Sequence, residues 1–199
     1  SNSSDLLGRQ EAKALLDHVA KDSPKLVEDL VPKLLPLHVL QRVLQYLLEE
    51  GVNIRDMRTI IETLAEHATK TQDPLELAGR VRSALGRAIV QQLFPGGVEL
   101  QVMALDPNLE RILAQAVAAG GTEGVLEPSL ADNLLRETAS AAQRQEDLGL
   151  PPVILVPNAL RWLLARFLRR AVPNLRVLAN SEVPESRNIR VTAIIGGPG

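Results

Sequence analysis

Apolar residues in the first half of the chain recur every three or four positions, which is the spacing of one face of a helix. The clearest stripe follows Pro36 and ends at Gly51, and glycine is common just past a helix end. Four other segments show the same period: 9–20, a short one from Pro24 to near Pro32, 53–68 and 73–93. The pattern therefore predicts a helical bundle for this half of the chain.

Two of these predicted helices begin with residues typical of helix starts. Asn53 is predicted to cap the first of them, and Asp56 adds negative charge in its first turn, where such charge is favoured. The other helix has Asp73 at the cap, Pro74 at the first helical position and Glu76 at the third. A helix running from there to residue 93 would be roughly 30 Å long, so we expect it to organise the bundle.

The period changes after residue 97, where apolar and polar side chains begin to alternate as in a strand. Four short strands are predicted, at 99–104, 153–156, 175–178 and 189–194. Helices are predicted between them, opened by Asp106-Pro107, by Pro128 (to about Leu148) and by Asn158 as a cap (to about Ala171). The glycine-containing segment 119–124 is predicted to be a flexible loop.

This order of elements predicts an α+β fold that is mostly helical. An all-α bundle at residues 1–97 is followed by a small α/β domain at 98–199, whose sheet has about four strands. If the strands at 153–156 and 175–178 are parallel, the crossover between them should be right-handed. No internal repeat is visible in the sequence.

The composition of the chain excludes several kinds of protein. Its apolar residues are mostly aliphatic, with two Phe, one Tyr and one Trp, which favours helix packing over an all-β sandwich. The absence of cysteine excludes disulfides, thiolate metal sites and a Cys nucleophile. No apolar run approaches the ~18–20 residues that span a bilayer, and no signal peptide opens the chain.

The motifs of common catalytic and cofactor sites are missing. His18, His38 and His67 are far apart in the sequence, so no metal site is predicted from them. Glycine-rich phosphate loops, a nucleophile elbow and the HExxH zinc motif are also missing. The sequence predicts no catalytic residue, cofactor or metal, and hence a protein that is not an enzyme.

Charge is distributed unevenly, although the net charge is only −2. Residues 1–98 carry 12 basic and 13 acidic side chains, residues 99–152 carry 3 and 9, and residues 153–199 carry 7 and 2. An acidic block followed by a basic one indicates a charged contact surface, or two elements that pair with each other.

Three charged residues, Arg55, Asp56 and Arg58, gather at one end of a predicted helix, more than a cap needs. The ordinary interpretation is a helix turn with a local ion pair that contributes about 0–1 kcal/mol. The functional interpretation is a contact with another subunit or with a partner protein.

A second candidate surface lies on the helix predicted at 158–171. Trp162 lies off its apolar stripe, beside Arg166 and Arg169, and Arg170 follows. Arginine and tryptophan are common interface anchors, but a solvated face that balances the acidic block is the ordinary interpretation. The other arginines of this region, Arg161, Arg176, Arg187 and Arg190, were assigned to the same basic surface.

These arginines also support a second class of function, a nucleic-acid-binding module. That alternative lacks interleaved aromatic residues, and an isoelectric point near 6.0 is not the usual electrostatic signature. A third class, an enzyme with a composite site, would require a deep pocket lined by titratable groups with shifted pKa values.

The chain resembles the flagellar type III export-gate (FHIPEP) family and its injectisome relatives. The motif Asn53-Ile54-Arg55-Asp56-Met57-Arg58-Thr59-Ile60 carries the likeness most clearly, and Pro151-Pro152-Val153-Ile154-Leu155-Val156 continues it. Further matching segments occur in order at 6–11, 24–32, 39–45, 81–92, 144–146, 164–170, 177–182 and 189–196. The segment 81–92 resembles the flagellar branch more than the injectisome branch, which remains the alternative.

The resemblance implies properties that the residues alone do not. The family is an inner-membrane protein with a multi-span part and a cytoplasmic region of four subdomains, which forms a nine-membered ring beneath the export gate. That region receives chaperone–substrate complexes and contacts the stalk of the export ATPase, alongside other export-gate membrane proteins. The chain is similar to the last two subdomains only, so no residue of the chaperone groove between the first two is assigned. Ring formation in the family relies partly on the other parts, so a monomer is the alternative oligomeric state for this piece alone.

The resemblance and the two charged clusters together predict contact residues. We expect Arg55, Asp56 and Arg58 to serve packing between subunits or subdomains. Trp162, Arg166, Arg169 and Arg170 would contact a partner, for which the stalk protein is the candidate.

Overall fold

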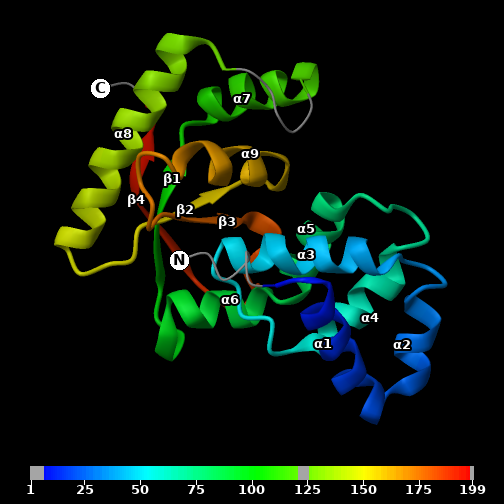
Figure 1. Cartoon of the computed structure of the whole chain (residues 1–199). Helices are drawn as coiled ribbons and strands as arrows, with labels where there is room; N and C mark the ends of the chain where they lie inside the picture. The colour runs from blue at the N-terminus through cyan, green and yellow to red at the C-terminus, as the bar shows by residue number, and fades with distance from the viewer. Residues whose placement is uncertain (1–6, 121–125, 198–199) are drawn as a thin grey trace. The chain divides into compact units, whose positions relative to one another are not determined.

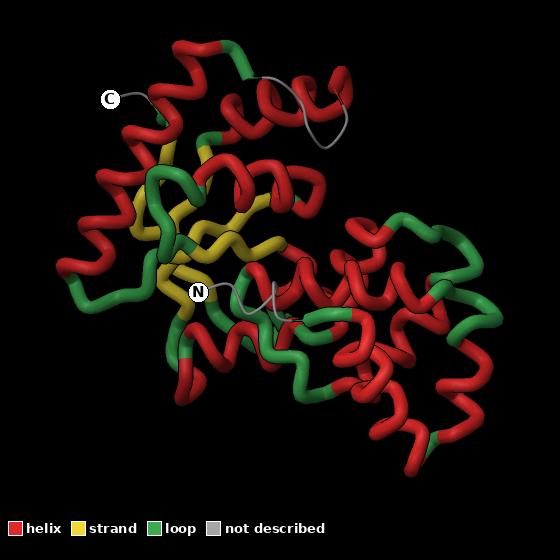
Figure 2. The backbone as a smooth tube through the Cα atoms, viewed as in Figure 1, coloured by secondary structure: helices red, strands yellow, loops and turns green. Residues whose placement is uncertain are grey.

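The computed structural model describes residues 7–120 and 126–197 of the chain (Figure 1). The chain divides into two compact units, residues 1–89 and 90–199. The first unit is all helical, and the strands all belong to the second (Figure 2). This confirms the predicted fold class, a mostly helical α+β chain.

The helices of the first unit follow the apolar stripes of the sequence. They are α1 (Arg9–Asp22), α2 (Pro24–Leu30), α3 (Leu37–Glu49), α4 (Met57–His67), α5 (Pro74–Ala84) and the beginning of α6 (Gly86–Leu93). Helix α5 packs against α3 and α4, and the side chains at this junction, among them Leu40, Leu44, Ile61, Leu64 and Leu77, are fully buried. Burial of one such side chain contributes about 1.5–3 kcal/mol, so this junction is the core of the unit.

The single long helix predicted at 73–93 is wrong, because the chain breaks at Leu85 between α5 and α6. Leu85 has φ −91° and ψ 6°, and its N–H donates to the carbonyls of both Val81 (2.9 Å) and Arg82 (3.1 Å). Gly86 follows, and glycine is a weak helix former. The apolar stripe continues through the break, which is why its period concealed the end of the helix.

Two predicted asparagine caps are also wrong, whereas the Asp73 cap is confirmed. Helix α4 is capped by Asp56, and Asn53 lies three residues before that cap. Helix α9 (Asn158–Leu168) has Pro157 at its cap position, and Asn158 instead accepts a hydrogen bond from the Ser181 N–H at 3.1 Å. In both places, a polar side chain near the start of a helix satisfies a different backbone group.

The second unit contains one parallel sheet of four strands, in the order β3-β2-β1-β4. The strands are β1 (Leu100–Leu105), β2 (Val153–Val156), β3 (Arg176–Ala179) and β4 (Ile189–Ile195), close to the predicted segments. Strands β2 and β3 are parallel, as the predicted crossover requires. Strand β4 forms one edge of the sheet, and β3 forms the other.

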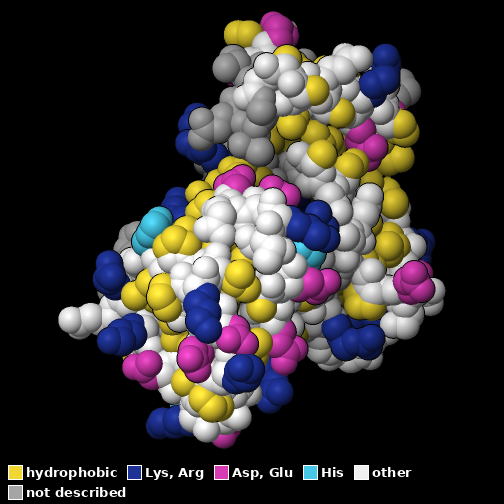
Figure 3. Space-filling model, turned by 90° about the vertical axis from the view of Figure 1, so that its right-hand side faces the viewer, with side chains coloured by type: hydrophobic (Ala, Val, Ile, Leu, Met, Phe, Trp, Pro, Cys, Tyr) yellow, Lys and Arg dark blue, Asp and Glu magenta, His cyan; other side chains and the backbone are white. Residues whose placement is uncertain are grey.

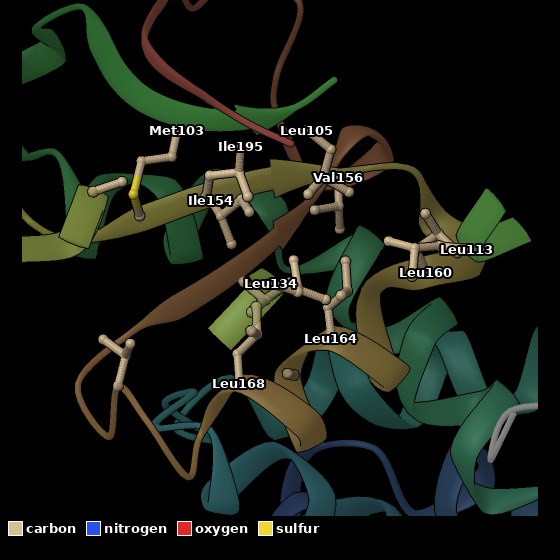
Figure 4. Close-up of a cluster of buried hydrophobic side chains, with 14 of the residues drawn as sticks. Met103, Leu105, Leu113, Leu134, Ile154, Val156, Leu160, Leu164, Leu168 and Ile195 are labelled. Atoms are coloured by element: carbon tan, nitrogen blue, oxygen red, sulfur yellow. The ribbon is translucent and has the colours of Figure 1, made fainter. Parts of the chain in front are cut away.

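One face of the sheet is covered by α7 (Pro107–Gly120), α8 (Pro128–Asp147) and α9 (Figure 1). Figure 4 shows the core on this face, where Met103, Ile154 and Val156 of the strands meet Leu134 of α8 and Leu164 of α9. Residues 119 and 120 are helical, unlike the predicted loop, and residues 121–124 of that loop lie outside the described residues. Helix α9 ends at Leu168, three residues before the predicted end.

A β-bulge in β4 decides which of its side chains reach this core. The register pairs Val102 of β1 with Val191 and Met103 with Ala193, so Thr192 is the extra residue. Ala193 and Ile195 therefore point toward α7 and α8 with Met103, which belongs to the core. The extra residue shifts the second half of β4 by one position, so that Ala193, and not Thr192, pairs with Met103.

Candidate functional site

The predicted cluster Arg55–Arg58 lies on a surface hollow of the first unit, which we call the Arg55 hollow. It is formed by the second half of α1 and by residues 53–58, and its volume is about 530 Å³. Apolar side chains line it, including Leu15, Val19 and Met57, and polar ones accompany them, including His18, Asp22 and Arg55. Such a mixture of apolar and polar groups suits recognition of a protein segment.

The loop that carries Arg55 is held by two short hydrogen-bonded turns. The Asn53 side-chain oxygen accepts the Arg55 N–H at 2.7 Å. The Asp56 carboxylate then accepts both the Thr59 N–H at 3.1 Å and the Thr59 hydroxyl at 2.6 Å, which caps α4. These turns fix the backbone on both sides of Arg55 while its side chain lies at the surface.

The structure gives different roles to the three predicted contact residues. Asp56 serves as the cap, and Arg58 forms an ion pair with Glu62 one turn along α4, with Nε and Oε1 2.9 Å apart. Both members of that pair are exposed, so it contributes little stability. The guanidinium of Arg55 has no ion pair within the described part of the chain, which makes Arg55 the member of the cluster available for an external contact.

The predicted basic surface on α9 is smaller than expected, because Arg161 is buried and not part of it. Its Nε lies 3.8 Å from Glu182 Oε2, and its Nη1 donates to the Val177 carbonyl at 3.4 Å. Glu182 is also buried and accepts the Ala179 N–H at 3.0 Å. Arg161 therefore joins α9 to the end of β3 and serves the structure of the unit.

The four predicted contact residues of this region differ in exposure. Trp162 is half-buried and Arg166 is exposed, and each already interacts with another group of the protein. Arg169 and Arg170 lie in the turn after α9, both exposed, and form no ion pair with any described residue. The pair Arg169–Arg170, which we call the α9 turn, is therefore the part of this surface best suited to a partner.

The remaining arginines do not extend a single basic patch. Arg187 donates from Nη2 to the carbonyls of Phe94 (3.0 Å) and Val98 (2.7 Å), and Arg190 lies 4.0 Å from Glu99. Figure 3 shows basic and acidic side chains interspersed on the face that it presents. A nucleic-acid surface would need a continuous basic stripe, so the main observation behind that alternative is lost.

The Arg55 hollow offers binding groups and no catalytic relay. Ser23, His18 and Asp22 all lie beside it, yet no hydrogen bond joins them in the described structure. A nucleophile and its base should lie within hydrogen-bond reach. Among the described residues, no group of three His, Asp or Glu side chains could hold a metal ion.

A clearly shifted carboxyl pKa belongs to Glu127, in the second unit. The hydroxyl of Ser129 and the backbone N–H groups of Ser129 and Leu130 donate to the Glu127 carboxylate and lower its pKa. Glu127 is the exposed cap of α8, so its shift reports a helix start. The sequence signal was present, since Pro128 at the first helical position puts Glu127 at the cap.

Sequence reasoning found the charges of the Arg55 hollow but missed its shape. Leu15 and Val19 share the helical apolar period of segment 9–20, and nothing in the sequence indicates that they meet residues 53–58. In the structure, Leu15 is only half-buried whereas its neighbour Leu16 belongs to the core. The apolar period does not distinguish these two leucines.

The described residues form a helical unit and an α/β unit with a parallel four-stranded sheet, with exposed arginines on both. Comparison with known proteins gives the family of the chain. The family described as "FHIPEP family" matches the chain over residues 1–188, so the chain belongs to the FHIPEP family. This confirms the resemblance carried by the sequence motifs.

Curated relatives of the chain are flagellar proteins. The flagellar biosynthesis protein FlhA of Salmonella typhimurium is 60% identical over 195 residues, which are 98% of this chain and 28% of that relative. FlhA of Bacillus subtilis is 32% identical over 192 residues. The chain therefore spans about a quarter of the length of the curated relatives that it matches.

Solved structures with the same fold come from type III secretion systems. The CdsV protein in the Chlamydia pneumoniae CdsV–CdsO complex is 27% identical with a TM-score of 0.89, and the match covers 97% of this chain and 56% of that one. The nonameric EPEC SctV-C is 28% identical with a TM-score of 0.81, over 98% of this chain and 59% of that one. In the described part of this chain, every helix is too short or too polar to cross a membrane.

Proposed function

We propose that the chain is part of the cytoplasmic region of a flagellar type III export gate, in the bacterial inner membrane. In this role it belongs to a ring-forming platform on which chaperone–substrate complexes and the export ATPase stalk dock. The observation that carries the proposal is the family match across residues 1–188, with 60% identity to a flagellar protein. Identity to the injectisome proteins is only 27–28%, which favours the flagellar branch.

Two described features support this role at the level of residues. The first is the Arg55 hollow, which we assign to packing between neighbouring subunits or subdomains, since a related protein is nonameric. The second is the α9 turn, with Trp162 and Arg166 beside it, which we assign to a partner such as the stalk; CdsV forms a complex with CdsO. The sequence predicts the boundary between the two subdomains after residue 97, and the compact units meet between residues 89 and 90.

The subunit contact is tested by charge reversal in the complete cytoplasmic region. Arg55→Glu should shift the assembly from rings toward monomers in analytical ultracentrifugation. The exposed guanidinium is replaced by a carboxylate, which would repel an acidic group of the neighbouring subunit. Arg80→Glu is the matched control, since Arg80 is exposed on α5 and forms no ion pair with a described residue. Equal assembly of both variants would remove Arg55 from the interface.

The partner contact is tested with purified stalk protein. The double variant Arg169→Glu/Arg170→Glu should weaken stalk binding by about tenfold or more and reduce cell motility, with an unchanged thermal midpoint. A double reversal on α8, Arg136→Glu/Arg144→Glu, makes the same charge change elsewhere in the unit. Normal stalk binding and motility in the first variant would contradict the assignment.

A further inference from the structure

Exposed apolar side chains gather along one edge of the sheet. Six large apolar residues are exposed in the described structure, and four of them lie in β4 or at Val98, two residues before β1. Their exposed fractions are 54% for Val98, 44% for Ile189, 49% for Val191 and 60% for Ile194. These four residues are called the β4 row below.

The register of the sheet places the β4 row on one face. Ile189 pairs with Leu100, Val191 with Val102, and, beyond the bulge at Thr192, Ile194 pairs with Ala104. Paired residues on parallel strands point to the same side, and Val98 lies two residues before Leu100 in extended backbone. This face is opposite to the one covered by α7, α8 and α9, because Met103 and Ile195 point to that core.

The cover over this second face stops between β1 and β4. Leu100 and Val102 are fully buried, whereas their neighbours Ile189 and Val191 are nearly half exposed. Parallel sheets normally have both faces covered, and contiguous exposed apolar patches mark interaction sites. The β4 row is therefore a part of the sheet that lacks its cover within the described chain.

The backbone beside the β4 row is also unpaired. Strand β4 is an edge strand, and no backbone group of the described chain bonds to its outer side. It is seven residues long, contains no proline and carries a single charge, Arg190, so most of the usual protections of an edge are missing. The bulge at Thr192 interrupts the edge only after Val191, which leaves residues 189–191 regular.

The charge beside this edge indicates what it would accept. Arg190 points to the face opposite Ile189 and Val191, and its side chain is 68% exposed. Its ion pair with Glu99, at 4.0 Å, is at the limit of contact and is solvated. Arg190 is the one charged side chain of β4, so an acidic residue of a partner is favoured beside it.

We propose that β4 accepts an extended segment of a partner protein, which adds a strand to the sheet and alternates apolar with acidic residues. Its apolar side chains would lie beside Ile189 and Val191, and an acidic side chain would lie beside Arg190. Main-chain hydrogen bonds supply affinity in strand addition, and the alternating side chains supply specificity. The site is separate from the Arg55 hollow and from the α9 turn, so it stands apart from the proposed function.

The experiment uses the whole chain and a fluorescein-labelled probe, the peptide acetyl-(Glu-Val)₄-amide, followed by fluorescence anisotropy. Two comparison peptides separate the contribution of charge from that of main-chain hydrogen bonds. The peptide (Lys-Val)₄ reverses the charge. A (Glu-Val)₄ peptide with alternate N-methylated amides cannot donate main-chain hydrogen bonds along one edge. We expect saturable binding of (Glu-Val)₄ and loss of about tenfold or more in affinity for either comparison peptide.

Variants of the protein locate the site. Val191→Asp should weaken binding of (Glu-Val)₄ by about tenfold or more, because it places a carboxylate in the β4 row. Leu148→Asp is the matched control, since Leu148 is 72% exposed and lies outside the sheet, and its binding should be unchanged. Arg190→Glu should reverse the preference toward (Lys-Val)₄, a gain of binding that a misfolded variant cannot give.

Several results would overturn the proposal. Absence of saturable (Glu-Val)₄ binding at millimolar peptide would do so, as would equal binding of the two charge types or of the N-methylated peptide. Unchanged binding of (Glu-Val)₄ to the Val191→Asp variant would show that the peptide binds elsewhere on the protein. A dimer of the wild-type chain that disappears in Val191→Asp, with no peptide binding, would make a second copy of the chain the occupant.

Discussion

Gly196 ends β4 at a point where a side chain would collide with α7. Its φ is +84°, and a Cβ atom built there would lie 2.5 Å from Leu109 Cδ2 and 3.2 Å from Leu109 Cβ. Gly149 has a similar φ of +76°, but no atom lies within 4 Å of its Cβ position. Comparison of the two glycines separates backbone strain from a packing clash, because Gly149 has only the positive φ whereas Gly196 has the positive φ and the contact with Leu109.

Alanine substitution should therefore cost more at Gly196 than at Gly149. Gly149→Ala pays for the positive φ alone, about 1–2 kcal/mol in the free energy of unfolding. Gly196→Ala adds the displacement of a buried leucine, about 1–3 kcal/mol more. Urea denaturation of both variants measures the difference, and equal losses would mean that α7 moves aside without cost.

The cap of α8 should make stability depend on pH. Hydrogen bonds from Ser129 and Leu130 hold the pKa of Glu127 below its ordinary value of 4.5 in the folded protein. A carboxyl whose pKa is lower in the folded state stabilises the fold above its unfolded pKa. That contribution is lost as the pH falls through the folded pKa.

Comparison with Glu127→Gln should isolate this effect. The wild-type protein should be the more stable at neutral pH, and the difference in free energy of unfolding should stay constant down to about pH 5 and then shrink in more acidic solution. Urea denaturation from pH 3 to pH 7 measures it. Glu137→Gln, an exposed change on the same helix, is the control, and a difference that grows toward low pH would contradict the assignment.

At the scale of elements, Gln145 fastens α8 to two strands at once. Its Nε2 donates to the Gln101 carbonyl of β1 at 3.1 Å, and its Oε1 accepts from the hydroxyl of Thr192 in β4 at 2.7 Å. The same hydroxyl lies 3.1 Å from the Val102 carbonyl. Gln145 is buried, and its two partly buried bonds hold α8 over the bulge.

Removal of this amide should leave the Gln101 carbonyl without its side-chain partner. Gln145→Leu should lower the free energy of unfolding by about 1–3 kcal/mol because of that loss, while the Thr192 hydroxyl keeps the Val102 carbonyl as a partner. The double variant Gln145→Leu/Thr192→Val should recover part of the loss. Gln143→Leu is the control, since Gln143 is exposed and bonds only to Asp147. Additive losses in the double variant would show that the two side chains do not act together.

Most helices and strands could be predicted from the sequence. Periodicity located every strand and most helices, because one buried face imposes a regular pattern on each element. It missed the break at Leu85, which keeps the apolar stripe intact while changing only backbone angles. The buried pair Arg161–Glu182 was missed because an arginine looks solvated until a distant carboxylate is brought against it.

The contact sites were predictable to a similar extent. Excess charge at the start of α4 pointed to Arg55, but the hollow beside it depends on tertiary packing with α1. The β4 row could not be separated from an ordinary buried strand, since Ile189 and Val191 alternate with Arg190 in the expected way up to the bulge. Only the register shows which of these side chains are left uncovered.

At the scale of the whole molecule, the predicted domain boundary and the compact units differ by eight residues. The sequence placed the boundary between residues 97 and 98, whereas the compact units meet between residues 89 and 90. Arg187 bonds to the carbonyls of both Phe94 and Val98, and Phe94 is buried. A second unit that begins at residue 98 would lose the bond to Phe94.

Two truncated chains should distinguish these boundaries. Residues 90–199 should be more stable than residues 98–199, by about 1.5–3 kcal/mol for a hydrogen bond to a charged group. Thermal and urea unfolding of both pieces measure the difference. Arg187→Met in the longer piece should remove most of its advantage, and equal stability of the two pieces would favour the boundary after residue 97.

The bulge at Thr192 also constrains how this strand can change in length. Side chains of a strand alternate between faces, so loss of one residue between Val191 and Ala193 would restore a regular ladder without changing which face each remaining side chain occupies against β1. Loss of Ala193 with the bulge kept would instead exchange the faces of Ile194 and Ile195, burying one and exposing the other. Single deletions should therefore be tolerated at one position of β4 and rejected at its neighbours, so that the bulge acts as the strand's only spare residue.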